Sequence, residues 1–348
     1  MSRVSVNIVT FNSFIYLENL LRSLEAQSYR DFSILVVDNA SRDGSAEYIT
    51  NEWPTVQLVR NRENAGFARA HNQAIHFSDS EFVLTLNPDV ILHEKFLERL
   101  VTAMEGKPRI GSASGKLLYA TGSPQELNAA TFSRLIDSTG IVIDRKRFFR
   151  DRGAGEEDRG QYDRTTLIFG ASGAAALYRR AALEDAALKF PPAPFQYFDE
   201  LYHSYKEDVD LAWRLERRGW ACEFVPGARA YHFRTLRLPA SGAVQQAREY
   251  RGRSPQLVYL SYRNHLYTLI KNEGTPPPMN HIYPITPINP IFNHISKYPH
   301  SNEYVVYIPL LPAVPDTILG SALLYVAVVP KPDPMTGCSA IARMSGFN

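Results

Sequence analysis

Several polar residues stand where the sequence pattern ends a strand or begins a helix, and their side chains suit ligand binding. Asp38 directly follows the apolar run Ser33–Val37, and its carboxylate can accept a hydrogen bond from a nucleobase imide or a ribose hydroxyl. Asn64 and Arg69 lie near the start of a helical pattern, where a guanidinium and the helix dipole both favour phosphate. The same residues suit an ordinary turn and a capped surface helix. The local pattern alone therefore leaves both interpretations open.

A carboxylate and a histidine predict a cation site. Asp89 follows the apolar run Phe82–Leu86 within the segment Asn87-Pro88-Asp89. A carboxylate in such a place suits a hard divalent cation, Mg²⁺ or Mn²⁺, that keeps most of its waters and also binds a substrate diphosphate. His232 follows a predicted strand, and its neutral imidazole could bind the same ion. The structural alternatives are a proline turn and an ordinary buried histidine.

The pair Glu207-Asp208 begins a helical pattern that has an apolar face. Acidic residues in the first turn of a helix complement its dipole, so part of this pattern is structural. Asp210 and Arg214 are four residues apart and support the same helix. One carboxylate of the pair Glu207-Asp208 remains available as a general base that removes a proton from an attacking hydroxyl.

The elements that position these residues alternate along the first 120 positions. Short β-rich runs separated by helical patterns predict βαβ units and an α/β fold with a mostly parallel, Rossmann-like sheet and flanking helices. Open sheets of this class bind ligands beyond the carboxyl ends of their strands. Thr10, Asp38 and Asp89 are therefore expected on one rim. The predicted strands are Val4–Thr10, Ser33–Val37, Val56–Arg60 and Phe82–Leu86.

The pattern is less regular in the second half of the chain. Asp144–Arg164 is dense in charged residues and glycine, which predicts an exposed, mobile loop or a lid that orders over a substrate. A strand at Thr166–Phe169 is expected next, and the small residues 170–176 are expected to lead into a helix that contains Leu183. A later strand is expected to end at Val225.

The composition changes after Gly274. Of the 23 prolines, 13 lie beyond this point, and the repeated prolines of 283–290 oppose both a regular helix and a central strand. We therefore expect a catalytic domain at 1–273, with a nucleotide-binding half 1–120 and an acceptor half 121–273, and an irregular, proline-rich tail at 274–348. The tail could be a docking segment, a membrane-surface appendage or a stretch read in a shifted frame, and it should be dispensable for the chemistry.

Charge and cysteine usage exclude several classes of protein. The chain has 38 Lys and Arg against 36 Asp and Glu, for a formal net charge of +2, so no basic excess points to nucleic acid. Cys222 and Cys338 form no CxxC pair, which argues against a disulfide framework and a cysteine zinc site. With no signal-peptide pattern and no apolar run as long as a membrane span, we expect a cytoplasmic protein. Its membrane contact would be at most peripheral, at the inner face of the plasma membrane.

Six short motifs occur in an order and spacing that resemble a family 2 glycosyltransferase of the rhamnosyltransferase-like branch. The resemblance covers about residues 3–272, and each motif alone is weak. The motifs are Val9-Thr10-Phe11-Asn12, Val37-Asp38-Asn39-Ala40-Ser41-Arg42-Asp43-Gly44-Ser45, Asn64-Ala65-Gly66-Phe67-Ala68, Leu86-Asn87-Pro88-Asp89, Gly170-Ala171-Ser172-Gly173-Ala174 and Glu207-Asp208-Val209-Asp210-Leu211.

The resemblance implies a GT-A fold, a nucleotide-sugar donor, a divalent metal and inversion at the anomeric carbon. It also implies rhamnose from dTDP-rhamnose as the sugar, a glycan or lipid-linked glycan as the acceptor, and a role in polysaccharide biosynthesis of the cell envelope. The oligomeric state stays open. Many relatives have Asp-x-Asp where this chain has Asn87-Pro88-Asp89, and the uncharged Asn87 implies weaker metal binding.

Site roles follow from the same resemblance, position by position. The nucleotide would contact Thr10, Asn12, Asp38, Asn64 and Arg69. Asp89 would bind the metal with His232, and Asp208 would be the base, with Glu207 beside it. The acceptor side would be formed by Gly170, Ser172 and Gly173.

Two other classes of function compete with this interpretation. A non-catalytic relative that binds nucleotide sugars or glycans is compatible with the same motifs. An NAD-dependent oxidoreductase is suggested by Gly170-x-x-Gly173 between a strand and a helix. That fingerprint, however, requires G-x-G-x-x-G in the first βα turn, where this chain lacks it.

Overall fold

The structure is a computed structural model that describes residues 2–145, 147–234, 255–273, 303–309, 324–330 and 344–345. The chain divides into two compact units, Met1–Asn264 and His265–Asn348. The division falls inside one helix, nine residues before the end of the domain expected from the sequence at 273. Every residue of the expected site lies in the first unit.

The first half of unit 1 follows the βαβ order expected from the sequence. It runs through β1 (Val4–Thr10), α1 (Phe14–Glu25), β2 (Phe32–Asp38), α2 (Ser45–Glu52), β3 (Gln57–Arg60), α3 (Gly66–His76), β4 (Phe82–Leu86), β5 (Val90–Leu92), α4 (Phe96–Met104) and β6 (Ile110–Ala120).

The second half has shorter elements. They are η1 (Ala129–Thr131), β7 (Phe132–Ser138), β8 (Ile141–Ile143), β9 (Phe149–Asp151), β10 (Leu167–Ile168), β11 (Ala175–Arg179), α5 (Arg180–Asp185), η2 (Glu200–Tyr202), α6 (Glu207–Arg217), β12 (Ala221–His232) and α8 (Pro255–Asn272).

One large sheet carries unit 1. Its strand order is β10-β12-β6-β11-β4-β1-β2-β3, with β5 paired to β12 and β7 to β6. The strands β3, β2, β1 and β4 are parallel, and β12 is parallel to β6, whereas β11 runs antiparallel between β4 and β6. The expected mostly parallel α/β fold is confirmed.

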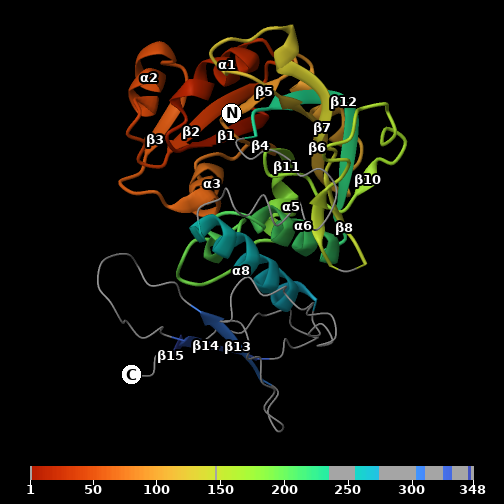
Figure 1. Ribbon diagram of the computed structural model, residues 1–348. Helices are drawn as coiled ribbons and strands as arrows, with labels where there is room; N and C mark the ends of the chain where they lie inside the picture. The colour runs from red at the N-terminus through yellow and green to blue at the C-terminus, as the bar shows by residue number, and fades with distance from the viewer. Residues whose placement is uncertain are drawn as a thin grey trace. The chain divides into compact units, whose positions relative to one another are not determined.

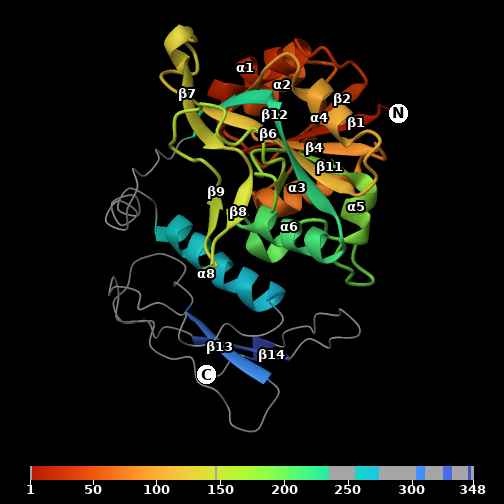
Figure 2. The ribbon, with the colours of Figure 1, turned by 90° about the vertical axis from the view of Figure 1, so that its right-hand side faces the viewer.

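Helices cover both faces of this sheet (Figures 1 and 2). The leucines of α1 and the apolar residues of α2 and α4 pack into one core with β1, β2 and β4. Apolar residues of α3, α5 and α6 pack on the opposite face. Because both faces are covered, the central strands consist of continuous apolar runs in the sequence. The sequence therefore predicts these strands well.

Two expectations for the second half are wrong in detail. Residues 175–179 form the strand β11 rather than the start of a helix, and α5 begins only at Arg180. Ala175–Arg179 pair with β4, and Ala176–Tyr178 also pair with β6, so tertiary pairing overrides the helix propensity of alanine. The strand expected to end at Val225 continues to His232. A shift in register between Val225 and Arg229 accommodates the proline and glycine of this strand.

Much of the charged segment 144–164 is exposed, as expected of a surface loop, but the segment also makes specific contacts with the rest of unit 1. It contains β9, which pairs with β8. The buried ammonium of Lys116 lies 2.8 Å from Asp158 and 2.7 Å from Asp163. The buried guanidinium of Arg152 donates to Thr139 and to the carbonyl of Thr165. These contacts account for part of the density of charge in the segment. A lid over a substrate stays a prediction.

Beyond 274 the structure describes three strands: β13 (Glu303–Pro309), β14 (Leu324–Pro330) and β15 (Met344–Ser345). They form an antiparallel sheet in the order β13-β14-β15, so these parts of the tail are regular, contrary to expectation. β-Branched and aromatic residues fill both longer strands. The proline-rich stretch 283–290 lies outside the described residues. No described helix is long and apolar enough to cross a membrane.

Candidate functional site

Two buried polar side chains with unused hydrogen-bonding atoms lie side by side at the carboxyl ends of β1 and β2. Thr10 and Asp38 are register partners and are 0% and 1% exposed. The Asp38 Oδ2 atom accepts a hydrogen bond from the backbone N–H of Ser41 at 3.1 Å. The Thr10 hydroxyl and the Asp38 Oδ1 atom have no hydrogen-bond partner among the described residues. Buried polar atoms are normally paired, so this pair fits a ligand that supplies hydrogen bonds.

The two loops after β1 and β2 hold each other in place. Asn12 donates from its backbone to the Ser41 hydroxyl at 2.9 Å, and its side-chain oxygen accepts from the backbone of Arg42 at 2.9 Å. Asn12 and Ala40 both have positive φ, at 51° and 64°. Non-glycine residues in this region are uncommon and concentrate at functional sites. The structure thus places Asn12 in the loop next to the Thr10–Asp38 pair, and its contact with a nucleotide stays a prediction.

Asn64 and Arg69 are less directly connected to this pair. The Asn64 side chain accepts from the backbone N–H of Gly66 at 2.9 Å and so shapes the turn before α3. The carbonyl of Gly66 accepts from Asn39 at 3.2 Å, which brings this turn next to the loop after β2. Arg69 is exposed and lies 4.0 Å from Glu200. A nucleotide contact for Asn64 and Arg69 stays a prediction.

Asp89 and His232 come together although they are far apart in the sequence. The strands β5 and β12 pair there, and His232 Nε2 lies 3.2 Å from Asp89 Oδ1. On its other side, His232 Nδ1 lies 2.8 Å from Asp137 Oδ2 of β7. Burial lowers the pKa of His232, but the two carboxylates raise it more, to about 10. The two carboxylates therefore favour the protonated imidazole in this arrangement.

The Asp137–His232–Asp89 row fits a divalent cation. Metal-binding histidines commonly donate one ring N–H to a carboxylate, which orients the ring and leaves the other nitrogen for the metal. Asp137 occupies that position, so His232 Nε2 and the half-buried Asp89 could hold a cation once the Nε2 proton has left. Among the residues described, no three acidic, histidine or cysteine side chains form a metal cluster. Two protein ligands suit an ion that is also bound by substrate phosphates.

Glu207 and Asp208 start α6, but their surroundings differ. Glu207 is 6% exposed, and its Oε2 atom has no hydrogen-bond partner in the part of the chain that the structure describes. Burial and the neighbouring Asp208 raise the pKa of Glu207 to about 8, so it is mainly protonated at neutral pH. Asp208 is half-buried, and its two oxygens accept from the backbone N–H groups of Gly173 at 3.0 Å and Val209 at 2.8 Å. Asp208 is thus the more exposed carboxylate of the two, and its role as base stays a prediction.

The segment 170–174 connects Asp208 to the turn that carries Asp89. Gly173 donates to Asp208, and the next residue, Ala174, accepts from the backbone of Asn87 at 2.9 Å. A Cβ added at Gly173 would lie 3.2 Å from Asp208 Oδ2, so a side chain there would crowd the carboxylate. Gly170 and Ser172 are buried in the same segment. Their contact with an acceptor stays a prediction.

Sequence reasoning missed three charged residues of this site. Arg234 lies 3.0 Å from Asp137 and 2.7 Å from Asp151, so it joins β7, β9 and the end of β12. Burial first raises the pKa of Asp137, but His232 and Arg234 hold it below its ordinary value. The sequence marks Asp137 only as a carboxylate that follows the apolar pair Leu135-Ile136. Nothing local marks Asp151, which lies among many charges.

The raised pKa of Glu207 predicts a pH dependence of stability. A folded-state pKa of about 8 exceeds that of an unfolded glutamate, so between about pH 4.5 and 8 the folded chain binds more protons. The free energy of unfolding should therefore fall as pH rises through this window. Glu207→Gln should flatten the fall, measured by chemical denaturation at pH 5 and pH 8. An equal fall in both proteins would contradict the assignment.

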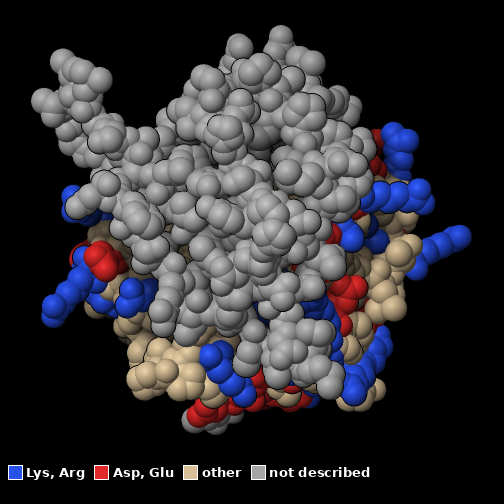
Figure 3. Space-filling model, turned by 90° about the horizontal axis from the view of Figure 1, so that it is seen from below, with Lys and Arg blue, Asp and Glu red and all other residues tan. Residues whose placement is uncertain are grey.

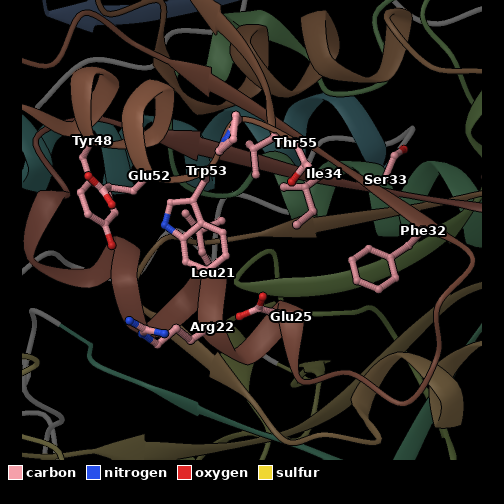
Figure 4. A pocket seen from close by; sticks show the side chains of 12 residues that line it. Leu21, Arg22, Glu25, Phe32, Ser33, Ile34, Tyr48, Glu52, Trp53 and Thr55 are labelled. Atoms are coloured by element: carbon pink, nitrogen blue, oxygen red, sulfur yellow. The ribbon is translucent and has the colours of Figure 1, made fainter.

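A separate hollow lies at the amino end of β2 (Figure 4). Trp53 and Tyr48 of the α2 region and Leu21 of α1 line it, together with charged side chains such as Glu25. Ligands of open α/β sheets bind beyond the carboxyl ends of the strands, which is the opposite edge. None of the site residues described above lines this hollow, so it is not part of the candidate site.

A sequence profile of glycosyl transferase family 2 matches residues 5–186. The N-acetylglucosaminyl-diphospho-decaprenol L-rhamnosyltransferase of Mycobacterium tuberculosis is 29% identical over 248 residues, which are 67% of this chain and 78% of that protein. The poly-beta-1,6-N-acetyl-D-glucosamine synthase of Staphylococcus aureus is 23% identical over 236 residues, 64% of this chain. The chain spans about half the length of that synthase, since the match covers 48% of it.

Solved structures share the fold at low sequence identity. The mannosyltransferase PcManGT from Pyrobaculum calidifontis, in complex with GDP-Man and Mn²⁺, has a TM-score of 0.50 and 18% identity over 80% of this chain and 66% of that one. GalNAc-T7 with UDP, GalNAc and Mn²⁺ has a TM-score of 0.52 and 16% identity over 76% of this chain and 47% of that one. The expected GT-A fold is confirmed.

Proposed function

Because this chain belongs to glycosyl transferase family 2 and is a glycosyltransferase, we propose that it inverts the anomeric carbon of a nucleotide-sugar donor, with Asp208 as the base. One observation carries the proposal. A half-buried carboxylate, aligned by the N–H groups of Gly173 and Val209, adjoins the segment that leads to the Asp89 turn. One short segment thus connects Asp208, the proposed base for the acceptor, to the turn of Asp89, which with His232 would hold the metal that binds the leaving diphosphate.

The proposed reaction needs two functions from the protein. Asp208 removes the proton from the acceptor hydroxyl as that oxygen attacks the anomeric carbon. Asp89 and His232 would hold Mg²⁺ or Mn²⁺, which supplies positive charge for the departing diphosphate. Asp137 orients His232 from behind. Lys, Arg, Asp and Glu side chains all lie on the described part of the face shown in Figure 3, and the formal net charge of +2 gives no basic excess that would favour nucleic acid.

We propose dTDP-rhamnose as the donor and a lipid-linked glycan as the acceptor. The M. tuberculosis relative is an N-acetylglucosaminyl-diphospho-decaprenol L-rhamnosyltransferase, which supports rhamnose as the sugar and a lipid-linked acceptor. The unpartnered Asp38 Oδ1 and Thr10 hydroxyl suit the imide and carbonyl groups of a pyrimidine. Polysaccharide biosynthesis for the cell envelope is the corresponding role.

A panel of nucleotide sugars tests this function. Each donor is incubated with the protein and Mn²⁺, and release of the nucleoside diphosphate is measured with and without a prenyl-diphosphate-linked N-acetylglucosamine acceptor. We expect release to be fastest with dTDP-rhamnose and to increase with the acceptor. Thermal protection without any turnover, by any donor of the panel, would instead favour a non-catalytic binding protein.

Asp38→Ala should weaken nucleotide binding. The lost bond to a pyrimidine imide is buried, so we expect dTDP and UDP affinity to fall by about 1 to 3 kcal/mol, measured by titration calorimetry. Asp43→Ala is the matched control, because Asp43 ends the same loop and accepts from the backbone of Phe14. An unchanged dTDP affinity in Asp38→Ala, or equal binding of GDP and dTDP by the unaltered chain, would contradict the assignment.

A further inference from the structure

The turn that precedes the candidate base has an unusual backbone. Between the end of η2 and the start of α6, three non-glycine residues have positive φ: His203 at 61°, Tyr205 at 72° and Lys206 at 71°. Residues with a Cβ rarely adopt this region, and they stay there only where surrounding contacts hold them. The segment therefore needs a restraint from elsewhere in the fold.

Asn264 of α8 supplies a restraint. Its side chain is 0% exposed, and its Nδ2 group donates to the carbonyl oxygens of Tyr202, Ser204 and Tyr205 at 2.9, 2.8 and 2.7 Å. An amide nitrogen has two hydrogens, so the three carbonyls share them. One buried amide thus fixes three of the four peptide groups from 202 to 205.

The restrained turn leads directly into the helix that carries Asp208. The Lys206 carbonyl accepts from Asp210 at 3.0 Å, which starts the hydrogen bonding of α6. Asp208 is held on its far side by Gly173. A change in the path of 202–206 would therefore move the start of α6 and turn the Asp208 carboxylate relative to Gly173.

We propose that Asn264 is a positioning residue for Asp208, acting through the 202–206 turn. This inference rests on the proposed role of Asp208 as the base. Attachment of α8 to the same region does not depend on Asn264 alone, because Arg263 donates to the carbonyls of Leu201 and Tyr202 at 2.7 and 3.2 Å. Asn264 is distinguished by its reach to Ser204 and Tyr205, the carbonyls nearest the base.

The test starts from Asn264→Asp, which keeps the shape but removes the amide donor. We expect kcat to fall by about 10- to 100-fold, because a small misplacement of a reacting group has an effect of this size. The donor KM should change less than two-fold, since the Thr10–Asp38 pair is untouched. Asn264→Ser, which keeps one hydroxyl donor, should show a smaller loss and serves if the aspartate variant does not fold. Wild-type kcat in both folded variants would overturn the proposal.

A double-mutant cycle separates positioning from general stability. If Asn264 acts through Asp208, Asn264→Asp should lower the residual kcat of Asp208→Asn by less than two-fold. A merely structural role would lower kcat by the same factor in both backgrounds, and that result would overturn the proposal. Asn272→Asp is the matched control: Asn272 is a buried asparagine of the same helix whose amide donates to Thr268 at 3.2 Å. Its kcat should stay within two-fold of wild type.

Amide hydrogen exchange gives a measurement that needs no activity. In Asn264→Asp, exchange should accelerate in 203–209 and stay unchanged in β1 and β2, with Asn272→Asp as the control. Unchanged exchange in 203–209 would overturn the proposal even in an active enzyme. Absence of sugar transfer by the unaltered chain, together with accelerated exchange in the variant, would instead refute the proposed function and leave Asn264 as the residue that orders this turn.

Discussion

Replacing Asp208 with asparagine should reduce kcat for sugar transfer by about 10²- to 10⁴-fold, the usual contribution of a general base. The asparagine keeps the shape of the side chain and can still accept from Gly173 and Val209 through one oxygen. It cannot take a proton from the acceptor. The donor KM should change little, because the base acts in the transition state and not in nucleotide binding.

Glu207→Gln is the matched control for this prediction. Glu207 is adjacent in sequence, and its raised pKa of about 8 means that it is already neutral near pH 7, as glutamine is. Its replacement should leave kcat within a few-fold of wild type at that pH. If kcat falls in Glu207→Gln and stays at the wild-type value in Asp208→Asn, Glu207 and not Asp208 is the base.

The pH profile provides a second check on Asp208. Burial raises the pKa of this carboxyl more than the N–H groups of Gly173 and Val209 lower it. A base must be deprotonated to act, so kcat should fall as pH drops through a value above that of an ordinary aspartate. A profile that stays flat to the usual aspartate range would contradict a rate-limiting role for Asp208.

The first half of the fold could be predicted from the sequence because its signals are local. The runs at Val4–Thr10 and Phe82–Leu86 are buried on both faces, so apolar composition alone marks them as strands. The turn residues that follow Ser33–Val37 and Phe82–Leu86 place Asp38 and Asp89 at the carboxyl ends of strands, where the structure also has them. The strand at 175–179 was missed because its pairing with β4 and β6 decides its conformation, and its alanines favour helix when considered alone.

The missed parts of the site depend on contacts between distant residues. Asp137 meets His232 across 95 positions, and no periodicity in either segment encodes that pairing. Asn264 reaches the 202–206 turn from a helix about 60 positions further on. Motif spacing locates residues that contact a ligand, but supporting residues follow from the tertiary fold, which one sequence does not reveal.

Removing the divalent metal should abolish transfer. Loss of the charge that stabilises a departing diphosphate removes several kcal/mol of transition-state stabilisation, so EDTA should lower the rate by at least about 100-fold, and added Mn²⁺ or Mg²⁺ should restore it. Asp89→Ala should have a comparable effect that excess metal does not reverse. Release of nucleoside diphosphate measures both. Full activity in EDTA, or in Asp89→Ala, would refute metal use at this site.

The substitution Asp137→Asn tests whether Asp89 and His232 bind a metal or only form a buried ion pair. Asparagine can still accept from His232 Nδ1 through its oxygen, but it lacks the charge that makes the imidazole a stronger ligand. Loss of such a supporting group typically lowers metal affinity by about 10- to 100-fold. The Mn²⁺ concentration for half-maximal rate should therefore rise by that factor while the rate at saturating Mn²⁺ changes less. If His232 only bridges two carboxylates, the Mn²⁺ dependence should stay as in wild type while thermal stability falls, and the histidine would then be structural.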